Sequence, residues 1–173
     1  TPSAGSEPVV LSTGRQRAAG NRVPSAPAAS AEYPYRDMEG KVVAVKGRFP
    51  ADDGGKTFAW RMVDSSQWTG LKGIKESDLA LYGCDRLDTG GPILFLEGEK
   101  AVEACWERGL AAACLPGGSA TTFFGRALEP LAGRHGVLLP DNDEAGRGLM
   151  RRLKAKLGEA ASVRMVVLPV PER

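Results

Sequence analysis

The stretch LLPDNDEAGR at residues 138–147, taken together with ILFLEG at residues 93–98, decides the fold. Each stretch opens with an apolar run that is typical of a buried β-strand and then turns acidic. Glu97 follows the first run directly, and Asp141 and Asp143 follow the second. Ligands of an open α/β sheet bind beyond the carboxyl ends of its strands, so this rule selects these three acids as candidate site residues. If the two strands are neighbours, the three carboxylates meet at one edge of the sheet.

Strand and helix signals alternate through the C-terminal half of the sequence. Short apolar runs predict strands, and amphipathic stretches predict helices. The expected strands are 93–96, 111–115, 136–139 and 163–168, and the expected helices are 100–108, 144–157 and a third that Ser119 caps and that runs to about Leu131. Because the connections are short, right-handed crossovers are expected. We therefore predict an α/β fold with a mainly parallel sheet flanked by helices on both faces.

The N-terminal half has a different pattern. Residues 1–31 are rich in Pro, Ala, Ser and Gly, which is typical of a flexible linker or tail. Further along, β-prone runs separated by turn signals predict a small antiparallel sheet, which a short helix follows. The runs are 33–36, 41–49 and 56–62, and the short helix is 76–82. These signals divide the chain into a linker (1–31), a small β-rich N-terminal subdomain (32–90) and an α/β catalytic domain (91–173).

Composition places the chain among ordinary globular proteins. It has 173 residues, a hydrophobic fraction of 42% and a formal net charge of +2, which is too small to argue for nucleic-acid binding by itself. Its three cysteines form no CxxC pair, which favours reduced thiols over a zinc site. No apolar run is long enough to cross a membrane, so we expect a cytoplasmic protein with no membrane partner. Because the sequence begins without Met and ends just after a predicted strand, we expect it to be part of a longer polypeptide.

The three acids predict a metal site. Clustered carboxylates repel one another unless a cation or a proton compensates them, which favours a hard divalent ion: Mg²⁺, with Mn²⁺ as the alternative. Magnesium shares its coordination sphere with substrate phosphates, so phosphoryl transfer or phosphodiester hydrolysis fits best. For Asp143 alone, N-capping of the helix at 144–157 is the simpler interpretation. The paired Asp141 and the separate Glu97 favour the metal.

These residues resemble a known family. Glu97-Gly98 after an apolar strand, followed by the Asp-x-Asp-x-Ala-Gly segment that starts at Asp141, looks like the TOPRIM fold of bacterial and phage primases, topoisomerases and some nucleases. The EGEK run at 97–100 and the LPGG turn at 115–118 are most similar to phage, plasmid and prophage primases or primase-helicases. The resemblance covers roughly residues 92–170. It implies that Glu97 acts as a general acid or base, and that Asp141 and Asp143 bind magnesium.

The chain departs from the family pattern in two places. Many primase-like members carry an Asp four residues after the glutamate, where this chain has Ala101. A further acidic motif usually follows the fourth strand, where the sequence ends at Glu172-Arg173. Both departures favour, as one alternative, a non-catalytic TOPRIM module that binds nucleic acid.

Basic and aromatic residues are interleaved in the predicted N-terminal sheet. Cations that meet phosphates, beside rings that stack on bases, suit a single-stranded nucleic acid. An ordinary sheet with rings inside and lysines outside explains the same pattern, but attachment to a TOPRIM-like domain favours binding. The candidate contacts to nucleic acid or nucleotide are Lys46, Arg48, Lys56, Arg61, Trp68, Lys72 and, from the helix after the acids, Arg147. A solvated helix face is the alternative for Arg147.

Two further residues have predicted roles. Lys100 lies just beyond Glu97, where it is a candidate catalytic cation that would neutralise triphosphate charge. His135 precedes a strand and is expected to be structural.

Together these features predict a magnesium-dependent, primase-like nucleotidyltransferase that synthesises short RNA primers on single-stranded DNA during replication. Its expected ligands are the DNA template and nucleoside triphosphates, and a replicative helicase, in the same polypeptide or a separate one, is an expected partner. The alternative enzyme is a TOPRIM metal-dependent nuclease, which would use the same acids to direct water at a phosphodiester. The N-terminal sheet favours the primase.

Overall fold

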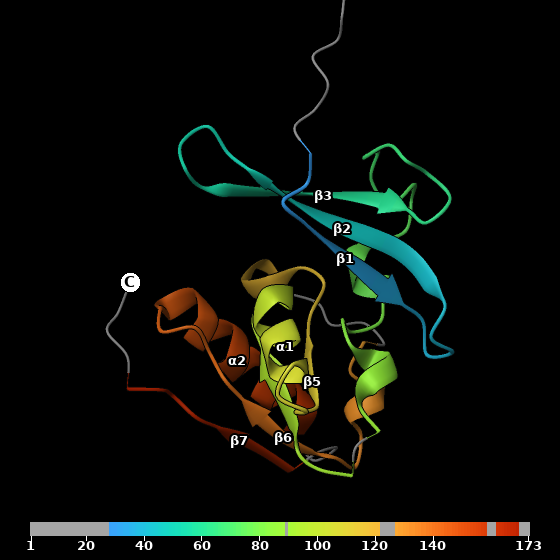
Figure 1. Cartoon of the computed structure of the whole chain (residues 1–173). Helices are drawn as coiled ribbons and strands as arrows, with labels where there is room; N and C mark the ends of the chain where they lie inside the picture. The colour runs from blue at the N-terminus through green and yellow to red at the C-terminus, as the bar shows by residue number, and fades with distance from the viewer. Residues whose placement is uncertain (1–27, 89, 122–126, 159–161, 170–173) are drawn as a thin grey trace, which may run out of the picture.

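The computed structural model describes residues 28–88, 90–121, 127–158 and 162–169 (Figure 1). It contains an antiparallel sheet of order β1-β2-β3 and a parallel sheet of order β5-β4-β6-β7. The antiparallel strands are β1 (Ala31–Arg36), β2 (Val42–Pro50) and β3 (Lys56–Met62). They lie where the turn signals predicted them, so the small N-terminal sheet is confirmed. The predicted linker falls largely outside the described residues.

The parallel sheet has its topological switch point in the middle. Its strands are β4 (Ile93–Leu96), β5 (Ala112–Cys114), β6 (His135–Leu138) and β7 (Ser162–Met165). The chain moves from β4 outward to β5 through α1 (Glu99–Trp106), and from β6 outward in the other direction to β7 through α2 (Glu144–Leu157). Right-handed crossovers in opposite directions place the two helices on opposite faces. The switch point therefore lies between β4 and β6, where an open α/β sheet binds its ligands.

Side-chain alternation along β4 builds two separate apolar layers. Ile93 and Phe95 belong to a buried cluster that includes Leu149 and Leu153 of α2. Leu94, between them in sequence, packs against the cluster that includes Val102 of α1. Because successive strand residues point to opposite faces, both faces of the parallel sheet are covered. The predicted α/β fold is confirmed.

The small sheet shares a core with the parallel sheet. Figure 1 shows it lying across the end of α1 and β5, and Tyr35 and Trp60 pack in one buried cluster with Val102 and Cys114. Tyr82 adds an antiparallel bridge to Cys114 at the edge of β5. These contacts fix the small sheet against the parallel sheet. The strands and helices on the two sides of residue 90 therefore share one hydrophobic cluster.

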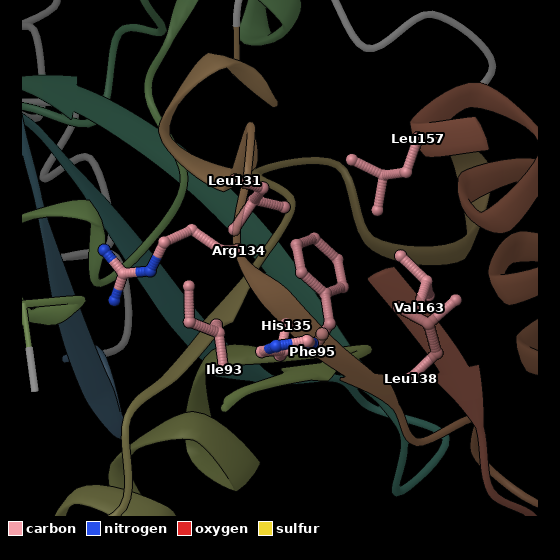
Figure 2. A pocket seen from close by; sticks show the side chains of 9 residues that line it. Ile93, Phe95, Leu131, Arg134, His135, Leu138, Leu157 and Val163 are labelled. Atoms are coloured by element: carbon pink, nitrogen blue, oxygen red, sulfur yellow. The ribbon is translucent and has the colours of Figure 1, made fainter. Parts of the chain in front are cut away.

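The amino end of the parallel sheet is filled by apolar side chains. Figure 2 shows a small space there, with the side chains of Arg134 and His135 beside the apolar ones. Its apolar lining consists of Ile93, Phe95, Leu131, Leu138, Leu157 and Val163. His135 begins β6 at this end, whereas the predicted acids follow the other end of the strands. This position fits the structural role predicted for His135.

Two predicted helices are not formed as expected. The helix predicted at 76–82 is a single 3-10 turn at Glu76–Asp78, because Leu79 is already extended and is buried in the core. The helix predicted from Ser119 to Leu131 begins instead as a 3-10 turn at Gly118–Ala120 and is extended again at Thr121. A second 3-10 turn spans Glu129–Leu131, with Pro130 inside it. Residues 122–126 of this prediction lie outside the described residues.

Candidate active site

Three acids lie at the switch point of the parallel sheet. Glu97 comes directly after β4, and Asp141 and Asp143 come after β6, which pairs with β4 in parallel. The Leu139 N–H donates to the Phe95 carbonyl at 2.9 Å and continues this pairing toward the acids. A Cβ built on Gly146 would lie 2.5 Å from Glu97 Oε2 and 3.0 Å from the backbone N of Asp141, so Glu97 lies beside the loop that carries the two aspartates.

Glu97 has one carboxylate oxygen that is buried without a hydrogen-bond partner among the described residues, namely Oε2. Ser119 lies close enough to the Glu97 carboxylate to lower its pKa as a hydrogen-bonding neighbour. Sequence reasoning missed this role of Ser119 because it assigned the residue to a helix cap. A buried polar atom without a partner is costly, which indicates that a group outside the chain completes the site.

The pKa of Glu97 is raised above its ordinary value. Burial is the main cause, and the negative charges of Asp141 and Asp143 add to it. The Ser119 hydrogen bond and the positive charge of Lys56 act in the opposite direction. A carboxyl group with a raised pKa suits proton transfer near neutral pH.

Gly146 allows Glu97 to pack against the first turn of α2. A Cβ at Gly146 would lie 2.5 Å from Glu97 Oε2 and 3.0 Å from the backbone N and O of Asp141. No side chain fits in that space, so glycine is required for the two acidic segments to approach each other.

Asp143 is the N-cap of α2. Its Oδ1 accepts the Gly146 N–H at 2.8 Å, so the capping interpretation is confirmed. This bond uses one oxygen and fixes the direction of the carboxylate, while the residue as a whole stays exposed, as does Asp141. Capping and metal binding are therefore compatible at this position.

The chemistry of these acids fits a divalent metal ion. In the part of the chain that the structure describes, no three His, Cys, Asp or Glu side chains are close enough to hold one ion together. Magnesium, however, keeps several waters and takes few protein ligands. The unpartnered Oε2 of Glu97 beside two exposed carboxylates offers oxygen ligands of the kind that such an ion needs.

The inner face of the small sheet, defined here as the face turned toward the parallel sheet, carries part of the predicted binding set. Lys46, Arg48 and Lys56 belong to this face, because Lys46 is paired across the strands with Tyr33 and Trp60 of the shared core, and residues two apart share a face. Arg48 is partly exposed and Lys56 is exposed. The charge of Lys56 reaches Glu97, so the tip of the β2–β3 hairpin lies near the acids.

Lys46 does not fit its predicted role in nucleic-acid binding. It is 8% exposed, and its Nζ donates to Glu99 Oε1 at 2.7 Å and to the Pro116 carbonyl at 2.6 Å. Tyr35 donates its hydroxyl to the same Glu99 oxygen at 2.7 Å. The Lys46 ammonium group is buried and is already bonded to two acceptors within the protein. The sequence pattern could not predict this, because Glu99 is distant from Lys46 in the sequence.

The outer face of the small sheet carries Arg61 and Trp68. The Trp68 ring covers Gly47, where a Cβ would lie 2.5 Å from it, and Arg61 stacks over that ring at 5.2 Å. Arg61 also forms an ion pair with Glu32 at 2.9 Å. These two residues pack the face turned away from the acids, so strand alternation separates them from Arg48 and Lys56.

The remaining predicted residues lie near the acids or in an exposed turn. Arg147 donates to Asn142 Oδ1 at 3.0 Å and lies 3.6 Å from a Glu144 oxygen, which holds its guanidinium beside the acidic loop. Lys100 is exposed on the first turn of α1, just past Glu97. Lys72 is exposed in the turn after β3, where its φ of 47° is left-handed.

Comparison with known proteins gives matches among solved structures only. No protein-family model matches the sequence, and no curated protein matches it. A DNA primase domain from Pseudomonas aeruginosa matches with a TM-score of 0.56 and 22% identity, over 82% of this chain and 44% of that one. The DnaG catalytic core matches with a TM-score of 0.55 and 25% identity, over 82% and 45%. The fold is the TOPRIM-like α/β fold of primase catalytic cores.

A third match is a DnaG primase catalytic domain bound to single-stranded DNA, with a TM-score of 0.52 and 20% identity, over 82% of this chain and 44% of that one. The chain thus spans less than half the length of the structures that it matches. Among the described residues, no helix combines the length and the apolar character that crossing a bilayer requires.

Proposed function

We propose that this chain is a primase-like nucleotidyltransferase module that joins ribonucleotides on a single-stranded DNA template. One observation carries the proposal: Glu97, Asp141 and Asp143 follow the two neighbouring strands at the switch point of a fold shared with primase catalytic cores. A fold alone does not assign a function. The acids matter because they occupy the place where such a sheet binds ligands, and because one of their oxygens is buried without a partner.

The acids would hold Mg²⁺, with Mn²⁺ as a substitute. When bound, the ion would stabilise the charge that develops on the oxygens of the transferred phosphoryl group. Glu97 would accept the proton of the attacking hydroxyl, since burial raises its pKa. Ser119 would keep the Glu97 carboxylate oriented, and the bond from Gly146 would keep the Asp143 carboxylate in place.

The basic residues around this edge would bind the phosphates of template and nucleotide. Arg48 and Lys56 belong to the face of the small sheet that is turned toward the parallel sheet, and Phe58 beside them is 42% exposed and offers a ring for base stacking. Lys100 would neutralise part of the triphosphate charge. The match to a primase domain solved with single-stranded DNA supports this ligand. Two further proposals rest only on the resemblance of the motifs: that a replicative helicase is a partner, and that the protein comes from a phage or a plasmid.

The test is incorporation of labelled ribonucleotides on single-stranded DNA with magnesium, with degradation of the DNA followed in the same gels. Glu97→Gln and Asp141→Asn are the test variants, and Asp53→Asn, an exposed hairpin-turn acid, is the matched control. We expect the wild-type chain to make short oligonucleotides and both test variants to lose at least about 100-fold in rate, because each removes a charged group from the reacting centre.

The other outcomes would overturn the proposal in identifiable ways. Metal-dependent cleavage of the DNA that both variants lose would establish a nuclease instead. Binding of DNA without synthesis or cleavage would establish a non-catalytic module, for which Ala101 is the sequence indication.

A further inference from the structure

A buried polar cluster connects the small sheet to the loops that carry the acidic edge. It consists of Lys46, Glu99, Tyr35 and the Pro116 carbonyl, and we call it the Lys46 cluster. Lys46 and Glu99 are 8% and 4% exposed, and their ion pair is 2.7 Å long. The Lys46 Nζ also lies 4.8 Å from the centre of the Phe58 ring. The Lys46 ammonium therefore joins β2, β3, α1 and the loop after β5, and Glu99 adds β1 through its bond from Tyr35.

Both partners of Lys46 are close in sequence to the candidate site. Glu99 is two residues beyond Glu97, and Gly98 between them is the N-cap of α1. Pro116 is three residues before Ser119, a polar neighbour of the Glu97 carboxylate. A shift of Lys46 would therefore move both segments that hold Glu97.

The same strand carries a residue toward the substrate. Arg48 is two residues beyond Lys46 on β2 and shares its face of the sheet. The distance between a template phosphate held there and Glu97 is thus set through Lys46. Misplacement of reacting groups by about 1 Å can reduce a rate about 100-fold.

Stability alone does not explain a buried ion pair. Desolvation of two charges cancels much of their attraction, so apolar residues of similar volume often stabilise a protein as well or better. Buried ionic groups are retained in some proteins because they fix a unique arrangement.

We propose that Lys46 and Glu99 are positioning residues, which hold the inner face of the small sheet and the Glu97–Ser119 pair in register for transfer. The inference rests on the proposed function and deepens it. It assigns no contact between Lys46 and nucleic acid.

The experiment compares the full chain with the single variant Lys46→Met, the apolar double variant Lys46→Met/Glu99→Leu and the conservative variant Lys46→Arg. The matched control is Arg36→Met/Asp85→Leu, which removes an ion pair between β1 of the same sheet and the 3-10 turn at Cys84–Arg86. Three measurements are made on each protein: the melting temperature, kcat and KM for primer synthesis, and hydrogen exchange in residues 114–121.

We expect Lys46→Met to lower the melting temperature, because Glu99 is left buried and unpaired. The apolar double variant should recover part of this loss but not all of it, because the buried Tyr35 hydroxyl then lacks its acceptor. The double variant should still lose kcat by about 100-fold with a nucleotide KM that changes by less than about 3-fold. Exchange in residues 114–121 should be at least about 10-fold faster, because the bond to the Pro116 carbonyl is gone. Lys46→Arg should recover most of kcat, and the control should keep it.

A double variant that melts like the wild type and recovers kcat would overturn the proposal and leave a purely structural pair. Unchanged exchange in residues 114–121 of the folded double variant would also overturn it. Failure of the proposed function would be seen separately, because the wild-type chain would then make no primers. Hydrogen exchange in residues 114–121 would still show whether the Lys46 cluster holds that segment in place.

Discussion

The two ends of the parallel sheet differ in what they bury. At the amino end, Ile93 and Leu138 line a small space whose lining is mostly apolar. At the carboxyl end of the same strands, Glu97 buries an oxygen that has no partner among the described residues, and two aspartates follow the neighbouring strand. The amino end contributes stability, and the carboxyl end gives up stability for a charged site that a metal ion and phosphates would complete. This difference between the two ends of the sheet can be tested with pairs of substitutions.

The largest expected effect is at Gly146, which allows the two acidic segments to meet. Gly146→Ala should reduce primer synthesis by at least about 100-fold, because the new methyl group displaces Glu97 Oε2 and the Asp141 backbone. Gly148→Ala in the same helix is the control, since its Cβ would meet only the ends of the Arg152 and Arg151 side chains, at 3.4 and 4.0 Å. The control should keep its activity and gain about 0.5–1 kcal/mol in stability from the higher helix propensity of alanine. Equal activities would contradict the close approach of Glu97 to α2.

The next effect concerns DNA affinity and extends the comparison to the small sheet, whose inner face is turned toward the parallel sheet. Arg48→Ala/Lys56→Ala should weaken binding of single-stranded DNA about 10-fold and reduce the slope of log affinity against log salt by about 0.7 per lost phosphate contact. Arg61→Ala on the outer face should leave the slope unchanged. Fluorescence anisotropy over a salt series measures both. If Arg61→Ala lowers the salt slope as much as the Arg48→Ala/Lys56→Ala variant does, the DNA binds across the outer face, and the assignment to the inner face is wrong.

A smaller effect is expected on stability when Glu97 loses its charge. Since burial raises the folded-state pKa of Glu97, the charged form destabilises the fold at neutral pH, and this penalty disappears as the pH falls below the unfolded pKa. Glu97→Gln should therefore melt a few degrees higher than wild type at neutral pH, with a difference that shrinks in acid. Added Mg²⁺ should raise the melting temperature of the wild type only. A variant that melts lower at neutral pH would show that the carboxylate is well compensated without a metal.

The smallest effect is expected at the amino end. His135 is exposed at the start of β6, far along the strand from the acids. His135→Ala should change the rate of primer synthesis by less than about 2-fold and the stability by no more than about 0.5 kcal/mol. A large loss of activity in this variant would contradict the division between the two ends.

The sequence predicted the strands, α2 and the acidic edge because each depends on local signals. Alternating and apolar runs gave the strands, and the boundaries of α2 followed from its cap and its apolar stripe. The acids could be selected because the carboxyl ends of strands follow from strand direction. The predicted helix at Ser119 is replaced by a 3-10 turn, in which Gly118 has a left-handed φ of 55° and after which Thr121 is extended.

The basic residues of the small sheet could not be sorted from the sequence. Lys46, Arg48 and Arg61 look alike as cations among aromatic residues, yet one is buried, one is on the inner face and one is on the outer face. Their faces depend on the register of three strands, and the burial of Lys46 depends on Glu99 from another part of the chain. Periodicity predicts neither.

The most direct test of the account is to locate a bound divalent ion. Mn²⁺ titrated into the ¹⁵N-labelled full chain broadens the amide signals nearest to it. We predict that the amides of residues 97–99 and 141–143 broaden first, followed by those of the hairpin tip near Lys56, while Ile93, His135 and Ser162 at the amino end stay sharp. Asp141→Asn should abolish this order. Broadening that begins at the Asp52-Asp53 turn or at the amino end, with the acidic edge unaffected, would contradict the central claim that the carboxyl end of the sheet is the metal-dependent site.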